Sequence, residues 1–344
     1  MHKHQLLHFL IILVIATSLL LSSCSGERDV VNIYSGRHYQ IDENLFRDFE
    51  RETGIRVNLI KADTDQLINR LEMEGNNSPA DIFITADAGR MIMAMDKGLL
   101  QPMDVTAIKD FVPSGLRDPD NYWTGITKRA RVLVYDPEKV DLSELSTYED
   151  LVLPHWQGRI LVRSSQNHYN QTLMASIIAE HGEEKAREWA AGIVDNMARP
   201  PRGNDRDQVK AIAAGEGDVA IVNTYYMGLL LNSTNREERN IAGQMKIFFP
   251  NQQDRGTHIN ISGIAIAAYA PNAQNAQKLI EYLLSKESQE AFANNNFEYP
   301  VRADAQWIEL FNEWGDFKSD TLPLDQLGAF LSPATIVFNQ AGWN

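Results

Sequence analysis

Tyrosines stand at three points of the chain where a predicted strand ends and a helix is expected to begin. Tyr39 closes the stretch SGRHY, Tyr169 lies in NHYNQ, and Tyr225 and Tyr226 are adjacent in NTYY. Neighbouring side chains of a strand point to opposite faces, whereas two phenols on a strand-to-helix turn converge on one point. The pattern therefore predicts phenol oxygens gathered at the ends of three strands.

Clustered phenols favour one class of ligand. A phenol loses its proton near pH 10, so it is a poor metal ligand until a highly charged cation displaces that proton. The resulting phenolate is a hard anionic oxygen, and several of them together offset about three positive charges. A zinc site would use cysteine and histidine ligands, and a calcium site would use carboxylate and carbonyl oxygens. Fe(III) is therefore the candidate ion. Each tyrosine taken alone is equally typical of a half-buried aromatic side chain whose hydroxyl has a hydrogen-bond partner.

The elements that must position these tyrosines alternate between strand and helix. The first unit has βαβαβ order, which predicts an α/β fold with a mostly parallel, doubly wound sheet. Its predicted strands are Val30–Tyr34, Ile55–Ile60 and Asp81–Thr85, and its predicted helices are Asn44–Glu52, Thr64–Glu74 and Met91–Lys97.

A second unit follows, and the apolar strand Ile261–Ala268 then returns to the first. A chain that leaves one α/β lobe, builds another and comes back makes two lobes with a cleft between them. Open α/β sheets bind ligands beyond the carboxyl ends of their strands, which is where the tyrosines stand. The predicted elements of the second unit are Arg131–Tyr135, Arg159–Val162, Thr172–His181, Lys185–Val194, Val209–Ala214 and Val219–Val222.

Residues 1–24 have the pattern of an export signal. A short basic start precedes an apolar run from Leu6 to Leu21, which suits a secretory signal better than a membrane span. The run closes on LSSC, which resembles the lipobox of bacterial lipoproteins, and Cys24 is the single cysteine of the chain. We expect residues 1–23 to be removed, Cys24 to be lipidated, and residues 24–29 to tether an extracytoplasmic domain to a membrane.

Composition excludes some functions. The chain has 344 residues, a net charge of −14 and no basic cluster, so nucleic acid is not an expected partner. The sequence has no GxSxG, HExxH or P-loop motif and no GxGxxG after a strand, so we expect a monomeric binding protein and no enzyme.

The combination of SGRHY, NHYNQ and NTYY resembles the periplasmic ferric-iron-binding proteins that feed bacterial ABC importers, in the branch with a His-Tyr pair in the first loop. The resemblance extends over nearly the whole mature chain, including PADIFITAD, HWQGRILVRSSQNHYNQ and EYPVR. It implies a bilobal type II periplasmic-binding-protein fold whose lobes close on the ligand by a hinge. Residues 30–130 and 263–325 would form lobe I, residues 131–262 would form lobe II, and residues 326–344 would pack near the hinge or lobe II.

The same resemblance implies a site and partners. The iron ligands of the family fall on His38, Tyr39, Tyr169, Tyr225 and Tyr226, and the loaded protein would dock on the permease of an importer driven by its ATPase. His168, beside Tyr169, stands where this branch would have an apolar residue. Three arginines are candidates to surround the phenolates and compensate their charge: Arg37, Arg202 and Arg206.

A bilobal binder of another solute, such as an oxyanion or a polyamine, is the alternative function. An anion binder of this architecture would use the NH groups of helix N-termini together with serine or threonine, and Ser35-Gly36 and Ser164-Ser165 could serve. Tyrosines at all three loops of the cleft argue against this alternative.

Overall fold

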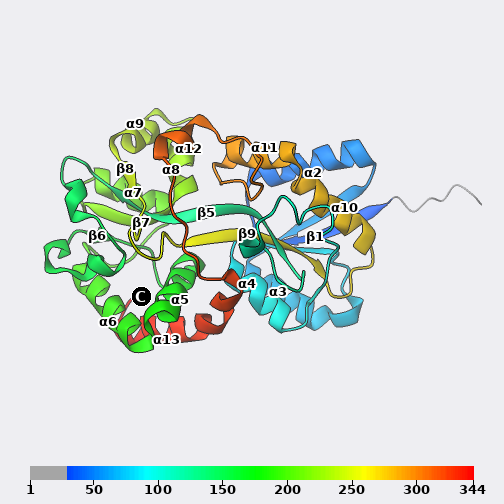
Figure 1. Cartoon of the computed structure of the whole chain (residues 1–344), viewed down its shortest axis with the longest axis horizontal. Helices are drawn as coiled ribbons and strands as arrows, with labels where there is room; N and C mark the ends of the chain where they lie inside the picture. The colour runs from blue at the N-terminus through cyan, green and yellow to red at the C-terminus, as the bar shows by residue number, and fades with distance from the viewer. Residues whose placement is uncertain (1–28) are drawn as a thin grey trace, which may run out of the picture.

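The computed structural model describes residues 29–344, and the predicted signal segment and Cys24 lie outside them. Two α/β lobes lie side by side (Figure 1). The first lobe contains three parallel strands in the order β2-β1-β3. Its first elements are β1 (Val30–Ser35), α2 (Gln40–Thr53), β2 (Arg56–Lys61), α3 (Thr64–Glu74), β3 (Ile82–Thr85), α4 (Ala88–Asp96) and β4 (Leu100–Gln101).

Two long strands, β5 (Thr124–Tyr135) and β9 (Ile259–Ala267), join the lobes. The first half of β5 pairs with β9, and its second half, from Arg131 onward, pairs with β7 (Val219–Asn223) and β8 (Lys246–Phe248). The described strands thus form one curled sheet of mixed direction. The parallel pairing expected of the first unit is confirmed for β1, β2 and β3, whereas both crossing strands run antiparallel to their neighbours.

The second lobe is built on β6 (Ile160–Leu161) and β7, which pair in parallel. Helix α13 (Leu331–Ala341) contacts α5 and α6 of this lobe. Among the described residues, no helix is long and apolar enough to cross a membrane. The helices of this lobe are α5 (His168–His181), α6 (Glu183–Asn196), α7 (Asp205–Ala213), α8 (Thr224–Leu231) and α9 (Arg236–Gln244).

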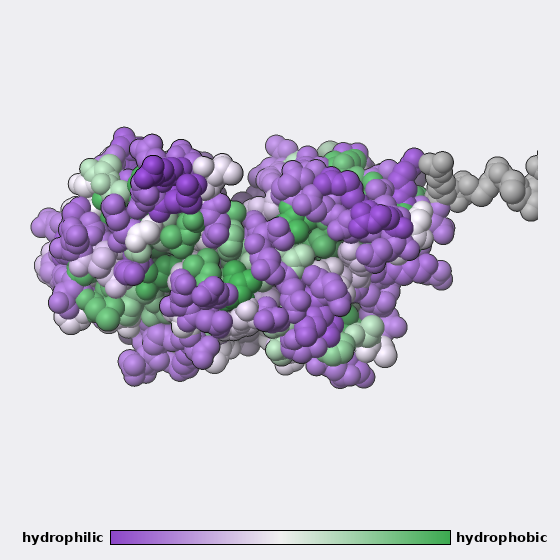
Figure 2. All heavy atoms as spheres, turned by 90° about the horizontal axis from the view of Figure 1, so that it is seen from above, coloured by the Kyte–Doolittle hydropathy of each residue, from purple (hydrophilic) through white to green (hydrophobic). Residues whose placement is uncertain are grey.

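Past β9 the chain re-enters the first lobe as α10 (Ala273–Leu283) and α11 (Lys286–Asn296), and α11 packs against both α2 and α8. The short helix α12 (Glu309–Trp314) belongs to an aromatic cluster that also contains Tyr225 of α8. Seen from above, the surface is notched between the lobes, and apolar residues gather on the left-hand lobe, which contains β6 and β7 (Figure 2).

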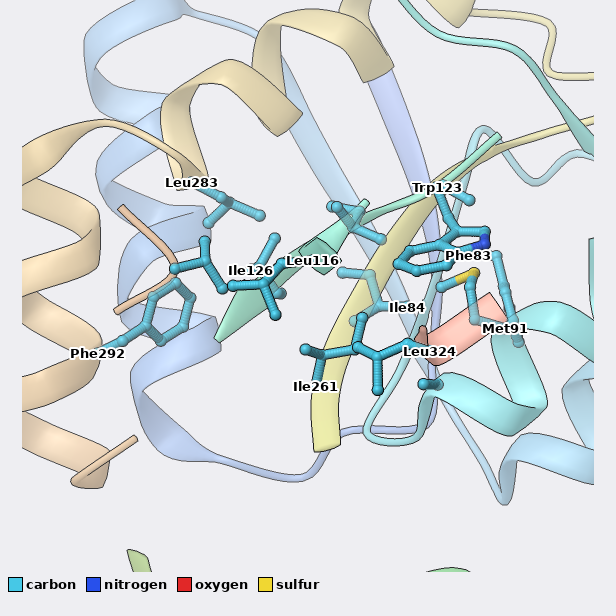
Figure 3. Packing of buried hydrophobic residues seen from close by; sticks show 14 of the residues in the cluster. Phe83, Ile84, Met91, Leu116, Trp123, Ile126, Ile261, Leu283, Phe292 and Leu324 are labelled. Carbon is cyan, nitrogen blue, oxygen red and sulfur yellow. The ribbon is translucent and has the colours of Figure 1, made fainter. Parts of the chain in front are cut away.

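Buried side chains anchor the crossing strands to the first lobe. Ile126 of β5 and Ile261 of β9 are almost completely buried, and Figure 3 shows them between Leu283 and Phe292 on one side and Trp123 on the other. Burying a side chain of this size contributes about 1.5–3 kcal/mol. The crossing strands are therefore packed into the hydrophobic core of the first lobe.

His258, the residue before β9, is almost completely buried, and we expect it to make the protein sensitive to acid. Burial lowers the pKa of its imidazole to about 3, and the guanidinium groups of Arg255 and Arg131 add to this effect. The unfolded chain takes up a proton below about pH 6.5, whereas the folded protein does so only near pH 3. The stabilisation from neutral His258 is therefore complete above pH 6.5 and is lost as the pH falls toward 3.

We expect the free energy of unfolding of the wild type to fall between pH 6.5 and 4, by up to about 1.4 kcal/mol per pH unit from this group. His258→Gln should show a shallower fall in urea titrations at pH 7, 6, 5 and 4. His155→Gln, at an exposed histidine, is the matched control and should keep the wild-type slope. Equal slopes for His258→Gln and the wild type would contradict the assignment.

Candidate metal centre

Four phenols stand at the N-termini of three helices, each helix following a strand of the sheet. Tyr39 is the N-cap residue of α2, with extended backbone angles. Tyr169 is the second residue of α5, and Tyr225 and Tyr226 are the second and third residues of α8. The positive end of a helix dipole favours a negative charge there, so all three helices favour the phenolate form.

The four side chains meet at one place between the lobes. The Tyr39 hydroxyl donates a hydrogen bond to the Tyr225 oxygen at 2.9 Å, and the Tyr169 oxygen lies 3.3 Å from the same atom. The rings of Tyr225 and Tyr226 are 4.1 Å apart between centroids, at an interplanar angle of 32°. The Tyr39 ring meets the Tyr225 ring edge-on at 5.8 Å. The structure thus brings together all four tyrosines that the sequence singles out.

A pocket of about 340 Å³ opens beside this cluster. It receives residues from the loop after β1, from the start of α3 and from the N-terminal ends of α5, α7 and α8. Its lining residues are Gly36, Arg37, His38, Tyr39, Asp63, Thr64, Ala86, His168, Tyr169, Arg206, Tyr226 and Leu229.

Burial favours the protonated form of Tyr39, Tyr225 and Tyr226 until a cation replaces their protons. Desolvation raises the pKa of Tyr39 and of Tyr225 well above the ordinary value, and the nearby charges of Tyr169 and Tyr226 raise both further. The pKa of Tyr226 is also raised, chiefly by burial. Phenols that repel one another as anions need a multiply charged cation between them to ionise together.

Two buried arginines lie against the rings of this cluster. The guanidinium of Arg37 is 4.6 Å from the centre of the Tyr39 ring, and that of Arg129 is 5.2 Å from the centre of the Tyr169 ring. Arg37 forms ion pairs with Asp42 and Glu298, both at 2.9 Å. The sequence predicts Arg37 near the phenols, but it gives no expectation for Arg129 or Glu298.

A second buried group of charges supports the Tyr225-Tyr226 turn. Asp205 accepts hydrogen bonds from Arg131 and Arg163, and also from the backbone N–H of Asn223, which precedes α8. Arg129 and Arg131 alternate with apolar residues in the run KRARVLVY. Charges in an otherwise apolar strand are the signal that points to buried partners.

The prediction for Arg202 is wrong. Arg202 is exposed, pairs with Glu216 at 2.8 Å, and lines a different surface pocket together with Arg199 and Lys210. The chain turns between Arg202 and α7, at Gly203 with φ of +73°, which separates this arginine from the phenols. Arg206, on the first turn of α7, does line the tyrosine pocket.

The two histidines predicted near the phenols also line the pocket. His38 is exposed at its edge, and the His168 ring lies 4.9 Å from the Tyr169 ring, edge-on. Burial lowers the pKa of His168, with Arg90 and Arg129 adding to the effect while Asp87 opposes it. Within residues 29–344, no group of three or more His, Cys, Asp or Glu side chains is placed to hold a metal ion, so the phenols are the candidate ligands.

Comparisons with known proteins show the family of the chain. A family model described as "Bacterial extracellular solute-binding protein" matches residues 77–315. Iron uptake protein A1 of Synechocystis sp. is 47% identical over 341 residues, which cover 96% of this chain and 95% of that protein.

Two solved structures extend the likeness to the fold. The Trichodesmium protein (IdiA, FutA) in complex with iron and citrate ligands has a TM-score of 0.87 at 45% identity, covering 92% of this chain and all of that one. The ferric binding protein from Campylobacter jejuni has a TM-score of 0.88 at 42% identity, and the match covers 91% of this chain and 100% of that one. The predicted bilobal fold is confirmed, and the chain belongs to the bacterial extracellular solute-binding proteins, within the group of periplasmic ferric-iron-binding proteins.

Proposed function

We propose that this protein is an extracytoplasmic lipoprotein that captures Fe(III) with tyrosine phenolates and delivers it to an ABC importer. The ligands would be Tyr39, Tyr169, Tyr225 and Tyr226, with His38 as a further donor at the edge of the pocket. The observation that carries the proposal is the contact of phenol oxygens from both lobes, at 2.9 and 3.3 Å around Tyr225.

The charges around the phenols support a trivalent ion. Four phenolates around Fe(III) leave one net negative charge. Four arginines and three carboxylates lie around the cluster in mutual ion pairs, which gives one net positive charge to offset it. The seven residues are Arg37, Arg129, Arg131, Arg163, Asp42, Asp205 and Glu298.

The geometry also fits docking of the loaded protein on an importer. Tyr39 follows a strand of the first lobe, and the other three phenols belong to helices of the second, so a bound ion links the lobes. The closed form is then the shape that an importer distinguishes from the empty protein. Lipidation of Cys24 would keep the protein at the membrane that carries the importer.

Titration of the purified mature protein with ferric citrate tests the proposal. Phenolate-to-iron charge transfer should give an orange to red absorption band that saturates near one iron per chain. A protein that stays colourless with excess ferric ion would contradict phenolate binding and would favour the alternative, a bilobal binder of an oxyanion or a polyamine.

A further inference from the structure

The two residues that follow α11, Phe297 and Glu298, contact groups that support both halves of the phenol cluster: Phe297 contacts α8, and Glu298 contacts Arg37. Phe297 has φ of +56° and ψ of 29°, a left-handed conformation that non-glycine residues seldom adopt. Its backbone N–H donates to the carbonyl of Ala293 at 3.2 Å and ends the helix. Tyr299, which follows Glu298, pairs with Lys128 of the crossing strand β5 through two backbone hydrogen bonds of 2.9 Å.

Phe297 sets the position of the helix that carries Tyr225 and Tyr226. A Cβ atom added to Gly228 would lie 2.3 Å from the Phe297 Cβ and 2.4 Å from its Cγ, so α8 approaches as closely as a glycine permits. Tyr225 and Phe297 belong to the same buried aromatic cluster. A glycine inside a helix lowers the stability of the helix, and a left-handed backbone conformation is strained for phenylalanine. Both occur at this one contact.

Glu298 holds the groups behind the other two phenols. Its carboxylate accepts hydrogen bonds from Arg37 at 2.9 and 3.2 Å and from Thr127 at 2.8 Å, and it lies 4.0 Å from Arg129. A further bond of 2.8 Å comes from the Asn296 amide. Arg37 and Arg129 are the two guanidinium groups that lie against the rings of Tyr39 and Tyr169.

We infer that the Phe297-Glu298 turn is a positioning device that fixes the spacing of all four phenols. Phe297 places Tyr225 and Tyr226 through α8, and Glu298 places Tyr39 and Tyr169 through two arginines. This inference deepens the proposed function and rests on it. A turn joined to the hinge strand keeps the ligands close to their binding geometry in the metal-free protein, so less ordering accompanies capture of the ion.

Gly228→Ala tests the contact with α8. The added methyl group must displace the helix from Phe297, and we expect the affinity for ferric ion to fall ~10–100-fold, the loss typical of groups that orient metal ligands. Gly243→Ala in α9, where an added Cβ has no atom within 4 Å, is the matched control and should bind as the wild type does. Gly228→Ala combined with Phe297→Gly removes the clash but also the side chain that positions α8, so it should recover only part of the loss.

Glu298→Gln tests the other side and does not depend on how well Gly228→Ala folds. If Glu298 acts through Tyr39, the loss of affinity in Glu298→Gln combined with Tyr39→Phe should be smaller than the sum of the two single losses, expressed as logarithms. Wild-type affinity and an unchanged charge-transfer band in both Gly228→Ala and Glu298→Gln would overturn the inference.

Amide hydrogen exchange of the metal-free protein separates this inference from the proposed function. Gly228→Ala should speed exchange at residues 228–231, whose amides donate to the first turns of α8, relative to Gly243→Ala and whether or not iron binds, because the helix loses its support. A wild type that stays colourless with ferric citrate refutes the proposed function. A coloured wild type whose Gly228→Ala variant keeps both its affinity and its exchange rates refutes the positioning role alone.

Discussion

Tyr225→Phe is expected to lower the affinity for ferric ion by more than roughly 100-fold. That is the upper range of the loss when a group that only orients a metal ligand is changed. The Tyr225 oxygen lies 2.9 Å from the Tyr39 oxygen and 3.3 Å from the Tyr169 oxygen, so it is the centre of the ligand set. The substitution removes that oxygen and leaves the ring in its buried aromatic cluster. Competition of the variant and the wild type against citrate for ferric ion, followed by the charge-transfer absorption, measures the loss.

The fold should survive this change, because each of the two hydrogen bonds that the Tyr225 hydroxyl makes with neutral phenols contributes only about 1 kcal/mol. Tyr282→Phe is the matched control, since Tyr282 packs on Phe49 in the first lobe, away from the pocket, with a ring-centroid distance of 5.5 Å. It loses the same hydroxyl group and should keep wild-type iron binding. Retained affinity and an unchanged absorption band in Tyr225→Phe would remove this residue from the ligand set.

The local parts of the site are readable from the sequence. The strand Val219–Asn223 and the helix that begins at Thr224 agree with the pattern to within a residue, because an apolar strand followed by polar residues marks its own end. The predicted placement of Tyr39 and Tyr169 at strand-to-helix junctions agrees with the structure in the same way. Local pattern therefore suffices to place the phenols at the ends of strands.

The long-range parts of the site are not readable in that way. Only Arg131–Tyr135 of β5 is predicted from sequence, because Lys128 and Arg129 break its apolar pattern, although the strand begins at Thr124. Arg129 is buried because its partners, Ser262 and the carbonyl of Ala86, come from distant segments. Charges within an apolar run indicate that a partner is buried with them, but which distant residues are the partners is known only from the fold.

Three helices escape prediction for related reasons. Helix α9 is mostly polar and buries only Ala242, so its pattern resembles an exposed loop. Helix α12 spans six residues, and α13 contains Pro333 in its first turn. The stability of such segments comes from tertiary packing, here the contacts of α13 with α5 and α6, more than from intrinsic propensity.

Lowering the pH is expected to release ferric ion steeply. Burial raises the pKa of Tyr39 and of Tyr225 well above the ordinary value, so both phenols keep their protons at neutral pH while the site holds no metal. Each phenolate formed on binding therefore sends one proton to solvent, and the affinity for Fe(III) must fall as the proton concentration rises. Displacement from all four phenols predicts a slope of up to about four logarithmic units of affinity per pH unit.

The number of protons released per iron is measured directly by adding ferric ion to unbuffered protein at constant pH, with the protons of the iron carrier subtracted. Each Tyr→Phe change at Tyr39, Tyr169, Tyr225 or Tyr226 should lower that number by one, whereas Tyr282→Phe should leave it unchanged. Circular dichroism at each pH separates release of iron from the acid unfolding expected through His258. A phenol with a raised pKa must lose its proton at neutral pH in order to bind the metal as a phenolate. Binding without proton release would therefore mean that groups already ionised, and not these phenols, hold the metal.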